Sequence, residues 1–478
     1  MITLFIVVPL ISVLILNLLP RKLADGLSLW WGLVLSIGLG AHVLATPQDS
    51  WNACDPVNSI LRWNVTPSNL AAVMFISIAL VVFSAFMTGR YLIADKNRRF
   101  IFNNLLILCM AGMNGVVLAN DLFSLYVFLE IVAASSFVLI SLERTTEGLE
   151  GAFKYLLLSS IATVLMLSSI ALLFMGCGSL DYETVGEFLK SGLFESSAPK
   201  FGLFAAALFM AGLFIKGGMV PFHGWLPDAY SAAPTAASVL LGGIVTKVAG
   251  VFTLLQLLQI VFGLEKPSVI LFTIGTLSIA VGAFAALGQK NFKRMLAYSS
   301  ISQIGYIVIG IASANPLGIA GAIFHLFNHS IFKTLLFVNS AVVEKESGTV
   351  DMNKLGGLSN KMPVTGYTSI LAFLSTAGIP PLSGFWSKLL IVLGVWQAGF
   401  HTVAIIAILL SLITVAYFLS MQRKVFFGKL AAGLEGIKEA NAWALIPEII
   451  LAILTLGLGL LTYPWLFNTF LVPIGSLL

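Results

Sequence analysis

The chain has 478 residues, of which 58% are hydrophobic and only 10% are charged, and its mean hydropathy is +0.99. This composition excludes a soluble domain, which could not bury so much apolar surface, and predicts a protein that crosses the membrane many times. The cysteines Cys54, Cys109 and Cys177 are scattered without a CxxC pair and predict neither a disulfide framework nor a metal or iron–sulfur site. The net charge of +5 comes from loop residues of a membrane protein and does not indicate a nucleic-acid partner.

Windows of about twenty apolar residues predict an all-α polytopic fold with about 14 transmembrane helices. The first window has no basic start and no small-residue cleavage site, so we interpret it as a spanning helix and not as a signal peptide. An even number of spans places both termini on the same side of the membrane. In chain order, the helices are expected near residues 2–19, 26–45, 69–89, 100–118, 121–141, 151–175, 203–226, 235–262, 267–288, 295–313, 316–341, 364–395, 402–422 and 444–465.

The loop charges predict the orientation. Cytoplasmic loops of membrane proteins carry an excess of Lys and Arg. The loops after the even-numbered helices contain few basic residues, namely Arg62, Lys190, Lys200 and Lys266. The loops after the odd-numbered helices contain many more: Arg21, Lys22, Arg90, Lys96, Arg98, Arg99, Arg144, Lys290, Lys293, Arg294, Lys345, Lys354, Lys361, Arg423, Lys424, Lys429 and Lys438. We therefore expect a multi-pass protein of the inner (plasma) membrane, with the basic loops in the cytoplasm and both termini outside.

Six charged residues lie inside stretches that otherwise read as spanning helices. A charge at the centre of such a helix costs about 2.5–3.5 kcal/mol on insertion scales, and a path for ions or protons is the usual reason to keep one. The alternative is that each lysine extends to an interface or neutralises a buried carboxylate. This explains the whole set less well, because only one acid is expected among five bases. The six are Glu130, Lys154, Lys216, Lys247, Lys333 and Lys388.

Two predicted helices are interrupted next to a lysine. In the seventh, Lys216 is followed by Gly217, Gly218 and Pro221; in the twelfth, the segment 377–384, which contains two prolines, precedes Lys388. Such breaks persist in a bilayer only where protein or water satisfies the freed backbone groups. Interrupted helices at matching positions of two halves indicate a transport path built from repeats. We expect two inverted five-helix repeats, helices 4–8 and 9–13, although a proline kink can also serve packing alone.

Three titratable residues share one face of the eleventh helix. His325, His329 and Lys333 are spaced by four residues, which places them above one another at 3.6 residues per turn. Histidine exchanges protons near neutral pH, so this stripe is suited to a proton relay. A buried histidine can also be a packing residue. The HxxxH spacing can bind a metal, but the sequence offers no acidic or cysteine third ligand, and we predict no metal site.

A buried lysine beside a carboxylate can act as a protonation switch. The carboxylate favours the protonated amine, and its withdrawal favours release of the proton. If Glu130 approaches Lys216 and then moves away, the expected change corresponds to roughly two pKa units, or about 2.7 kcal/mol. Moving one charge through 100 mV requires about 2.3 kcal/mol, so the two energies are matched.

Four residues flank these positions. Lys154 is either a second partner for Glu130 or an anchor that extends to the interface. Asp121 is interpreted as a helix cap. Asp228 lies either at the cytoplasmic mouth of a proton path or at a helix cap. His223 is close to it in the sequence and can take part in the same proton entry.

Several blocks of the sequence resemble the antiporter-like membrane subunits shared by respiratory complex I, Mrp-type cation/proton antiporters and energy-converting membrane-bound hydrogenases. The resemblance extends from the fourth to the twelfth predicted helix. The blocks are NDLFSLYVFLE ending at Glu130, KGGMVPFHGWLPDAYSAAPTAASVLLGGIVTK from Lys216 to Lys247, FKRMLAYSSISQIGY at Phe292–Tyr306, FHLFNHSIFKTLLF at Phe324–Phe337, and AGIPPLSGFWSK ending at Lys388.

The resemblance implies a domain organisation: N-terminal helices 1–3 in residues 1–99, a first repeat in 100–262, a second repeat in 263–425 and a C-terminal helix in 426–478. It also implies roles along a polar chain at the middle of the membrane. Glu130 and Lys216 would be a modulating ion pair and Lys247 the central relay. His325, His329 and Lys333 would be the onward link, and Lys388 the outer-facing exit. We call these seven the relay residues, with Lys154, His223 and Asp228 as possible additions.

The resemblance predicts a proton-translocating subunit of a multisubunit redox-driven membrane complex, similar to complex I or a membrane-bound hydrogenase. No nicotinamide, flavin or iron–sulfur signature is present, so we expect no cofactor in this chain and assign any redox chemistry to partner subunits. We expect this chain to differ from one complex I subunit type, which has a long lateral helix, and some members of the family have glutamate in place of Lys388. One alternative is the proton-carrying subunit of an Mrp-type sodium/proton antiporter. A second is a non-conducting scaffold. A third, a stand-alone solute carrier, is less well supported, because no set of mixed polar residues for an organic substrate stands out in the sequence.

Overall fold

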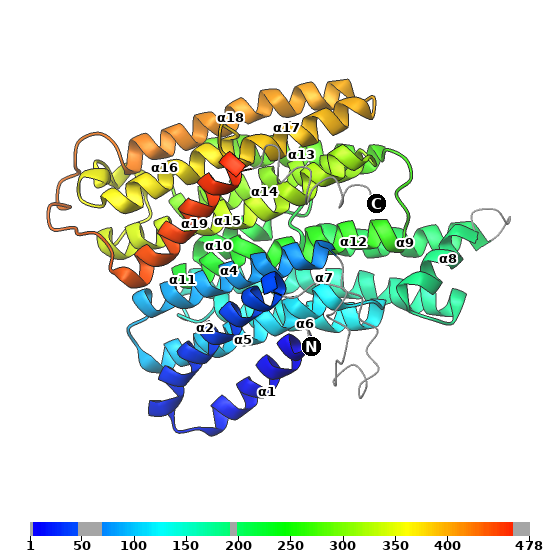
Figure 1. Ribbon diagram of the computed structural model, residues 1–478, viewed down its shortest axis with the longest axis horizontal. Helices are drawn as coiled ribbons and strands as arrows, with labels where there is room; N and C mark the ends of the chain where they lie inside the picture. Colours follow the sequence, from blue (N-terminus) through cyan, green and yellow to red (C-terminus); the bar gives the residue numbers. More distant parts are fainter. Residues whose placement is uncertain (1–2, 46–68, 192–197, 462–478) are drawn as a thin grey trace.

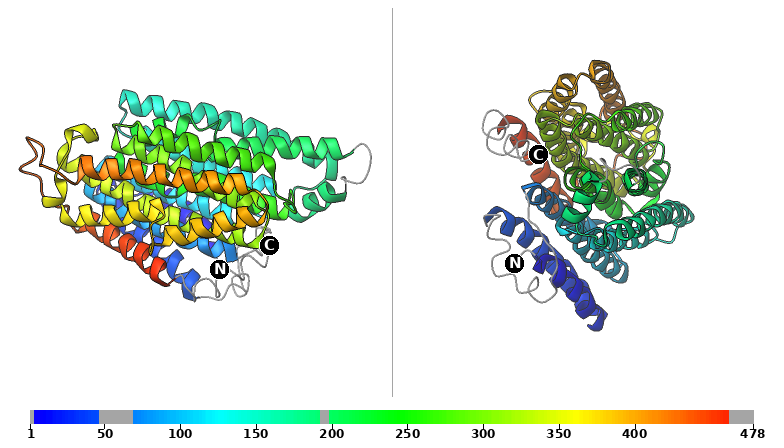
Figure 2. Two further views of the ribbon diagram at one scale, coloured as in Figure 1. Left: turned by 90° about the horizontal axis from the view of Figure 1, so that it is seen from above. Right: turned by 90° about the vertical axis from the view of Figure 1, so that its right-hand side faces the viewer.

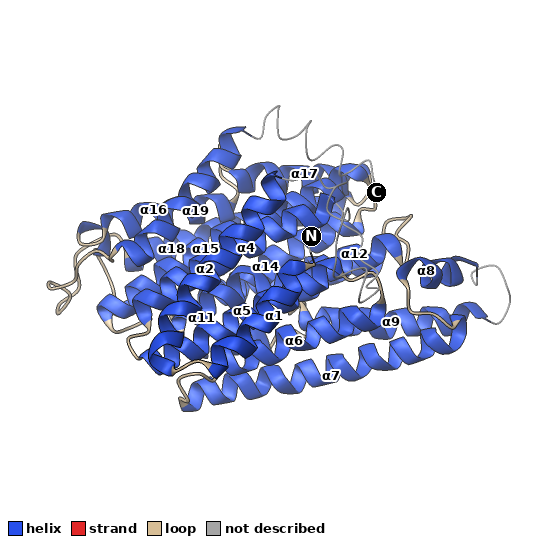
Figure 3. Ribbon diagram, turned by 60° about the horizontal axis from the view of Figure 1, so that its bottom comes forward, coloured by secondary structure: helices blue, strands red, loops and turns tan. Residues whose placement is uncertain are grey.

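The computed structural model describes residues 3–45, 69–191 and 198–461, and these residues form a bundle of long helices joined by loops (Figure 1). Colouring by secondary structure shows only helix and loop in this part of the chain (Figure 3), with two isolated β-bridges between loops. The predicted all-α membrane fold is confirmed. Cys54, Arg62 and the end of the last predicted helix lie outside the described residues.

Each predicted span coincides with one helix or with two to four consecutive shorter helical segments, and three short helices lie outside the predicted spans: α8, η4 and η5. Eleven helices in the described part of the chain are long and apolar enough to cross a membrane. The helices are α1 (Leu4–Leu18), α2 (Arg21–Ala45), α4 (Asn69–Leu92), α5 (Lys96–Leu118), α6 (Leu122–Ile140), α7 (Thr146–Cys177), α8 (Tyr182–Ser191), α9 (Ala198–Lys216), α10 (Trp225–Ala232), α11 (Thr235–Leu240), η2 (Leu241–Val245), η3 (Lys247–Phe252), α12 (Thr253–Ile260), α13 (Val269–Leu287), α14 (Phe292–Ala312), α15 (Pro316–Ser347), η4 (Met352–Lys354), η5 (Leu358–Asn360), α16 (Pro363–Ala377), α17 (Ser383–Gln397), α18 (His401–Val425) and α19 (Ala442–Leu461).

Several long helices begin at polar capping residues. The carboxylate of Asp121 accepts the Ser124 amide at 2.7 Å, which confirms its interpretation as a helix cap. Thr145 caps α7 and Asn315 caps α15 in the same manner. The interiors of these helices are mostly apolar, so the helix starts are set by these few polar side chains.

The helices divide into a buried centre and a lipid-facing periphery. Almost all of α14, most of α15 and residues 236–258 are buried, whereas α7 and α18 expose large aliphatic residues such as Leu157 and Leu412. The end-on view in Figure 2 shows green helices of the middle of the chain at the centre, with blue, red and orange helices on the outside. The helices with intramembrane lysines therefore include the most buried ones.

Both predicted interruptions are present. The seventh predicted helix ends at Lys216 as α9, and the chain resumes as α10 only at Trp225. The twelfth divides into α16, which ends at Ala377, and α17, which begins at Ser383. The glycines that follow the first halves, Gly218 and Gly378, have φ values of 64° and 84°, a conformation that other residues adopt at a cost.

The two halves of the chain contain matching local structures. α7 and α15 each have 32 residues and end before a left-handed glycine, Gly178 or Gly348. The loop after each helix returns to pair with the start of an earlier one, through the bridges Asp121↔Asp181 and Asn291↔Asp351. Figures 1 and 2 place α8 and the loop after α15 at opposite ends of the bundle. These features support two inverted repeats, and the boundaries at residues 99, 262 and 425 remain predictions.

Candidate functional site

The predicted ion pair is formed at the first helix break. Lys216, at the last position of α9, donates to Glu130 Oε1 of α6 at 2.9 Å and to Ser159 Oγ of α7 at 3.2 Å. Thr163 donates to the same glutamate oxygen at 2.7 Å. The lysine side chain is 3% exposed but the glutamate is 34% exposed. The amine is therefore fixed inside the bundle, while the carboxylate has room to move.

The first break packs directly on the helix that carries Lys247. A Cβ added to Gly250 of η3 would overlap the backbone of Gly217, so only glycine permits this approach. Lys247 begins η3, one of two π-helical stretches on either side of Thr246. Its amine is fully buried and donates to the carbonyl of Gly242, five residues earlier. π-Helical turns inside α-helices are frequent at functional sites, and hydropathy and spacing did not predict this one.

Lys333 is buried in the same central region, on α15. Its amine donates to the carbonyl of Leu296 at 3.1 Å and to the hydroxyl of Ser299, both on α14. It also lies 5.7 Å from the centroid of the Phe418 ring. In the described part of the chain, neither Lys333 nor Lys247 forms a salt bridge with a carboxylate. Neutral acceptors surround both amines, which suits groups that bind and release a proton.

The two histidines lie between the lysines of α15 and α17. Their rings are almost parallel, with centroids 6.2 Å apart. His325 Nδ1 lies 2.8 Å from Ser387 Oγ of α17, and both ring nitrogens of His329 lack a hydrogen-bonding partner among the described residues. Lys333 lies one turn further along α15, Lys388 follows Ser387 on α17, and η2, which holds the Gly242 carbonyl that Lys247 binds, packs on α15. The structure thus brings the predicted stripe and three of the lysines together.

Lys388 of α17 binds the second helix break. Its amine donates to the carbonyls of Thr376 at 2.7 Å and Ala377 at 3.5 Å, at the end of α16. It also lies 4.5 Å from the centroid of the Tyr306 ring. The carboxyl end of a helix carries a partial negative charge, which stabilises a cation at this position. A cavity of about 190 Å³ lies beside Lys388 and Tyr306 and is also lined by the exposed Ile408.

Further buried polar atoms lie on α14 and α15, the helices that surround Lys333. Ser302 and Gln303 of α14 and Ser340 of α15 have side-chain atoms that are buried and find no hydrogen-bonding partner among the described residues. Buried polar atoms are normally satisfied by protein or by water. These positions on α14 and α15 therefore offer sites where bound water would be favourable.

The flanking candidates form a separate cluster. Lys154 does not contact Glu130; it binds Glu150 and Asp228, each at 2.7 Å. Asp228 also binds Arg294 at 2.6 Å, and it lies within α10 and does not cap it. Burial favours a higher pKa for Asp228, but the hydrogen bonds from Lys154 and Arg294 outweigh it and hold the pKa below its usual value. This triad links α7, α10 and α14. His223 lies nearby in the loop before α10, is half-buried, and has a buried Nδ1 without a partner among the described residues.

The expectation of a single buried acid is wrong. Glu448 of α19 is fully buried, and Asp25 is buried in an ion pair with Arg99 that joins α2 to α5. Lys293 was expected to be a loop residue, whereas it is buried in α14 and lies 3.2 Å from Glu344. Glu448 had the same signal as Glu130, a charge inside an apolar span, and could have been found by it.

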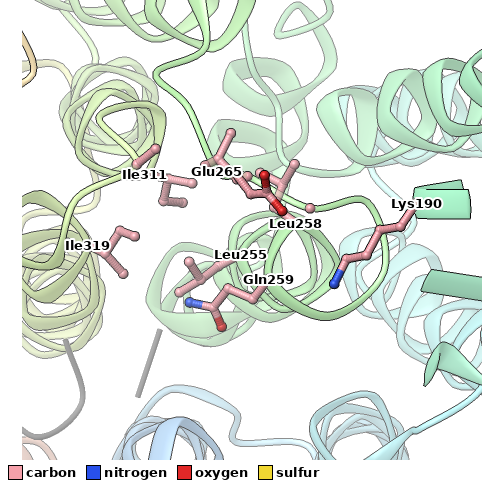
Figure 4. Close-up of a pocket in the computed structure, with 10 residues that line it drawn as sticks. Lys190, Leu255, Leu258, Gln259, Glu265, Ile311 and Ile319 are labelled. Carbon is pink, nitrogen blue, oxygen red and sulfur yellow. The ribbon is translucent and has the colours of Figure 1, made fainter. Parts of the chain in front are cut away.

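A larger cavity, of about 440 Å³, opens near α8. Figure 4 shows Lys190 with its amine directed towards Gln259, and the apolar side chains of Ile311 and Ile319 on the opposite side of the cavity. No relay residue lines it. Among the described residues, no group of three His, Cys, Asp or Glu side chains is arranged to hold a metal, so the HxxxH pair has no third ligand there.

The chain is similar to known membrane proteins. Residues 119–414 match the family described as NADH:quinone oxidoreductase/Mrp antiporter, TM. The chain is 30% identical over 411 residues to one of the Na(+)/H(+) antiporter subunits of Alkalihalophilus pseudofirmus, and the match covers 84% of this chain and 81% of the relative. It is also 30% identical over 477 residues to one of the F(420)H(2) dehydrogenase subunits of Methanosarcina mazei, with coverages of 96% and 94%.

A solved structure has the same fold. A chain of the Mrp complex from Dietzia sp. DQ12-45-1b superposes with a TM-score of 0.85, and the match covers 96% of this chain and 94% of the other. The two sequences are 23% identical. Both broken helices lie within residues 119–414, the region that the family model covers.

Proposed function

Because the chain belongs to the NADH:quinone oxidoreductase/Mrp antiporter family of membrane subunits, we propose that it translocates protons as one subunit of a larger membrane complex. The protons move along the relay residues: Glu130, Lys216, Lys247, His325, His329, Lys333 and Lys388. The observation that carries the proposal is the 2.9 Å ion pair between Lys216 and the partly exposed Glu130, located beside a helix break.

The geometry of this pair indicates how it would control protonation. With Glu130 in place, the Lys216 amine is stabilised in its charged form by the carboxylate and by Ser159. When the carboxylate moves away, the buried amine loses its counter-charge and releases a proton to the next acceptor. Lys247 is that acceptor, because η3 packs on the backbone beside Lys216. Water at the unpaired polar atoms then connects Lys247 with the histidines, Lys333 and Lys388.

We further propose that the complex is redox-driven and that partner subunits hold its cofactors. The similarity to an F(420)H(2) dehydrogenase subunit over almost the full length of both chains supports this assignment. In this arrangement the basic loops face the cytoplasm and both termini lie outside. The similarity to an Na(+)/H(+) antiporter subunit supports a second candidate, a proton-carrying subunit of an Mrp-type antiporter that uses the same residues without redox coupling.

The test is Lys216→Ala in the assembled complex. We expect proton transport in membrane vesicles to be abolished, because the first half of the path loses its titratable amine. Glu187→Ala on the exposed surface of α8 is the control and should transport at the wild-type rate. Wild-type transport by the Lys216→Ala complex would favour the scaffold. Co-purification of quinone-reducing or nickel–iron chains supports the redox-driven complex, whereas small antiporter subunits alone would identify the Mrp type.

A further inference from the structure

We propose that Glu448 is a further proton-carrying group, which exchanges a proton with Glu439 through the hydroxyl group of Thr365. This inference rests on the proposed function, since it adds a branch to the same proton path. Glu448 lies on α19, which is outside both predicted repeats and packs against α4, α15 and α16.

Glu448 is buried without a cationic partner. The residue is 0% exposed, and its carboxyl oxygen Oε2 lies 3.1 Å from Thr365 Oγ1 and 3.4 Å from Thr368 Oγ1, both on α16. None of the salt bridges between described residues includes it. An ionised carboxylate in such surroundings costs several kcal/mol. The neutral acid avoids this cost only by holding a proton.

The hydrogen bonds of Thr365 indicate where that proton is shared. Its hydroxyl oxygen lies 2.9 Å from Glu439 Oε1 and 3.1 Å from Glu448 Oε2. A hydroxyl group has one hydrogen and can donate to only one of these oxygens. For both contacts to be hydrogen bonds, one carboxyl group must donate to Thr365. Glu439 already accepts the Val364 amide at 2.7 Å and has the shorter contact with Thr365, so we assign the proton to Glu448.

This arrangement permits a balanced transfer. The O–H bond of Glu448 breaks as its proton binds Thr365 Oγ1, while the original hydroxyl hydrogen of Thr365 passes to Glu439 Oε1. The threonine is unchanged, the charge moves from Glu439 to Glu448, and no other reactant is needed. Glu439 is only half-buried and follows the exposed Lys438 in the loop before α19, so it connects the pair with the surface.

The inner side of Glu448 leads towards the relay residues. Asn339 of α15 donates to Thr368 Oγ1 at 2.9 Å, and its own Oδ1 is buried and unpaired among the described residues. Asn339 follows Lys333 by six residues, which corresponds to about 9 Å along the helix. Among the described residues, Tyr91 also lies near the pair, and it is hydrogen-bonded to Glu346 and contacts the amine of Lys345. Glu448 thus lies between the surface at Glu439 and the region of Lys333.

The experiment compares Glu448→Gln, Thr365→Val and Thr365→Ser in the assembled complex. We expect proton transport to fall about tenfold in Glu448→Gln and in Thr365→Val, and to stay near the wild-type rate in Thr365→Ser, which keeps the hydroxyl. The double variant Glu448→Gln/Thr365→Val should be no slower than the slower single variant, because both changes interrupt one path. The infrared spectrum of Glu448→Gln should lack the carbonyl band of one protonated carboxylic acid. Glu435→Gln, an exposed acid of the same loop, is the matched control.

Two results would overturn the inference. One is an assembled Glu448→Gln complex that transports within twofold of the wild-type rate, and the other is equal transport by Thr365→Val and Thr365→Ser. If Glu448→Gln fails to assemble, the comparison of Thr365→Val with Thr365→Ser still tests the inference. Lys216→Ala separates the two proposals: if it is inactive while Glu448→Gln is normal, only this inference fails, and if both are normal, the proposed function fails as well.

Discussion

The two helix breaks hold their lysines in different ways. At the first break, Lys216 is bound to a carboxylate, Glu130, which is partly exposed and belongs to another helix. At the second break, Lys388 is bound to the carbonyls of Thr376 and Ala377, which are fixed at the end of α16. A carboxylate on a side chain can move and so change the affinity of the amine for a proton. A backbone carbonyl cannot, so we infer that the first break regulates protonation and that the second provides a permanent site.

Of the variants that test this comparison, Lys388→Met should have the largest effect on proton transport. The variant fills a similar volume but removes the titratable group at the second break, so we expect at least a tenfold loss of proton transport by the assembled complex. It also leaves two carbonyls without their donor, at a cost of about 1–3 kcal/mol of stability. The control is Lys429→Met on the exposed surface. Unchanged transport in Lys388→Met would show that the second break is only structural.

Glu130→Gln should have an intermediate effect. Glutamine keeps the hydrogen-bonding shape but not the charge, so Lys216 loses its counter-ion and we expect transport to fall severalfold without being abolished. Thr163→Val removes only the other hydrogen bond to the same oxygen and should reduce transport less. The ratio of the two rates, measured in vesicles, isolates the charge from the hydrogen bonding. Equal rates would argue against regulation by the carboxylate.

Asp228→Asn should have the smallest effect, since the triad with Lys154 and Arg294 is partly exposed and lies apart from both relay lysines at the breaks. We expect a loss of roughly 1 kcal/mol of stability and near-normal transport. The lowered pKa of Asp228 means that its stabilisation is complete above the usual aspartate pKa of about 3.9 and is lost as the pH falls through the lowered value. The difference in melting temperature between variant and wild type should therefore be constant from about pH 8 to pH 5 and shrink only in stronger acid. A difference that already disappears near pH 6 would contradict this assignment.

Much of the path was predictable because charges are rare in spanning helices. Lys216, Lys247, Lys333 and Lys388 are conspicuous against apolar neighbours, and helical spacing alone places His325 and His329 on the face of Lys333. The same criterion applies to Glu448, a charge inside the predicted span 444–465, so the sequence contained the signal for this residue as well. The partner of Lys154 was harder to predict, because its position near a helix end fits a buried partner and a surface partner equally well.

The amino-acid sequence by itself determined the number of spans, the two breaks and the identity of the titratable groups. These depend on local properties: apolar length, the missing amide of proline and the charge of single side chains. The tertiary structure decided which partner each charge has. It paired Lys216 with Glu130 across 86 positions, placed Lys388 on carbonyls, and brought Thr365 between two glutamates. Such pairings depend on how helices that are distant in the chain pack together, and hydropathy does not specify that packing.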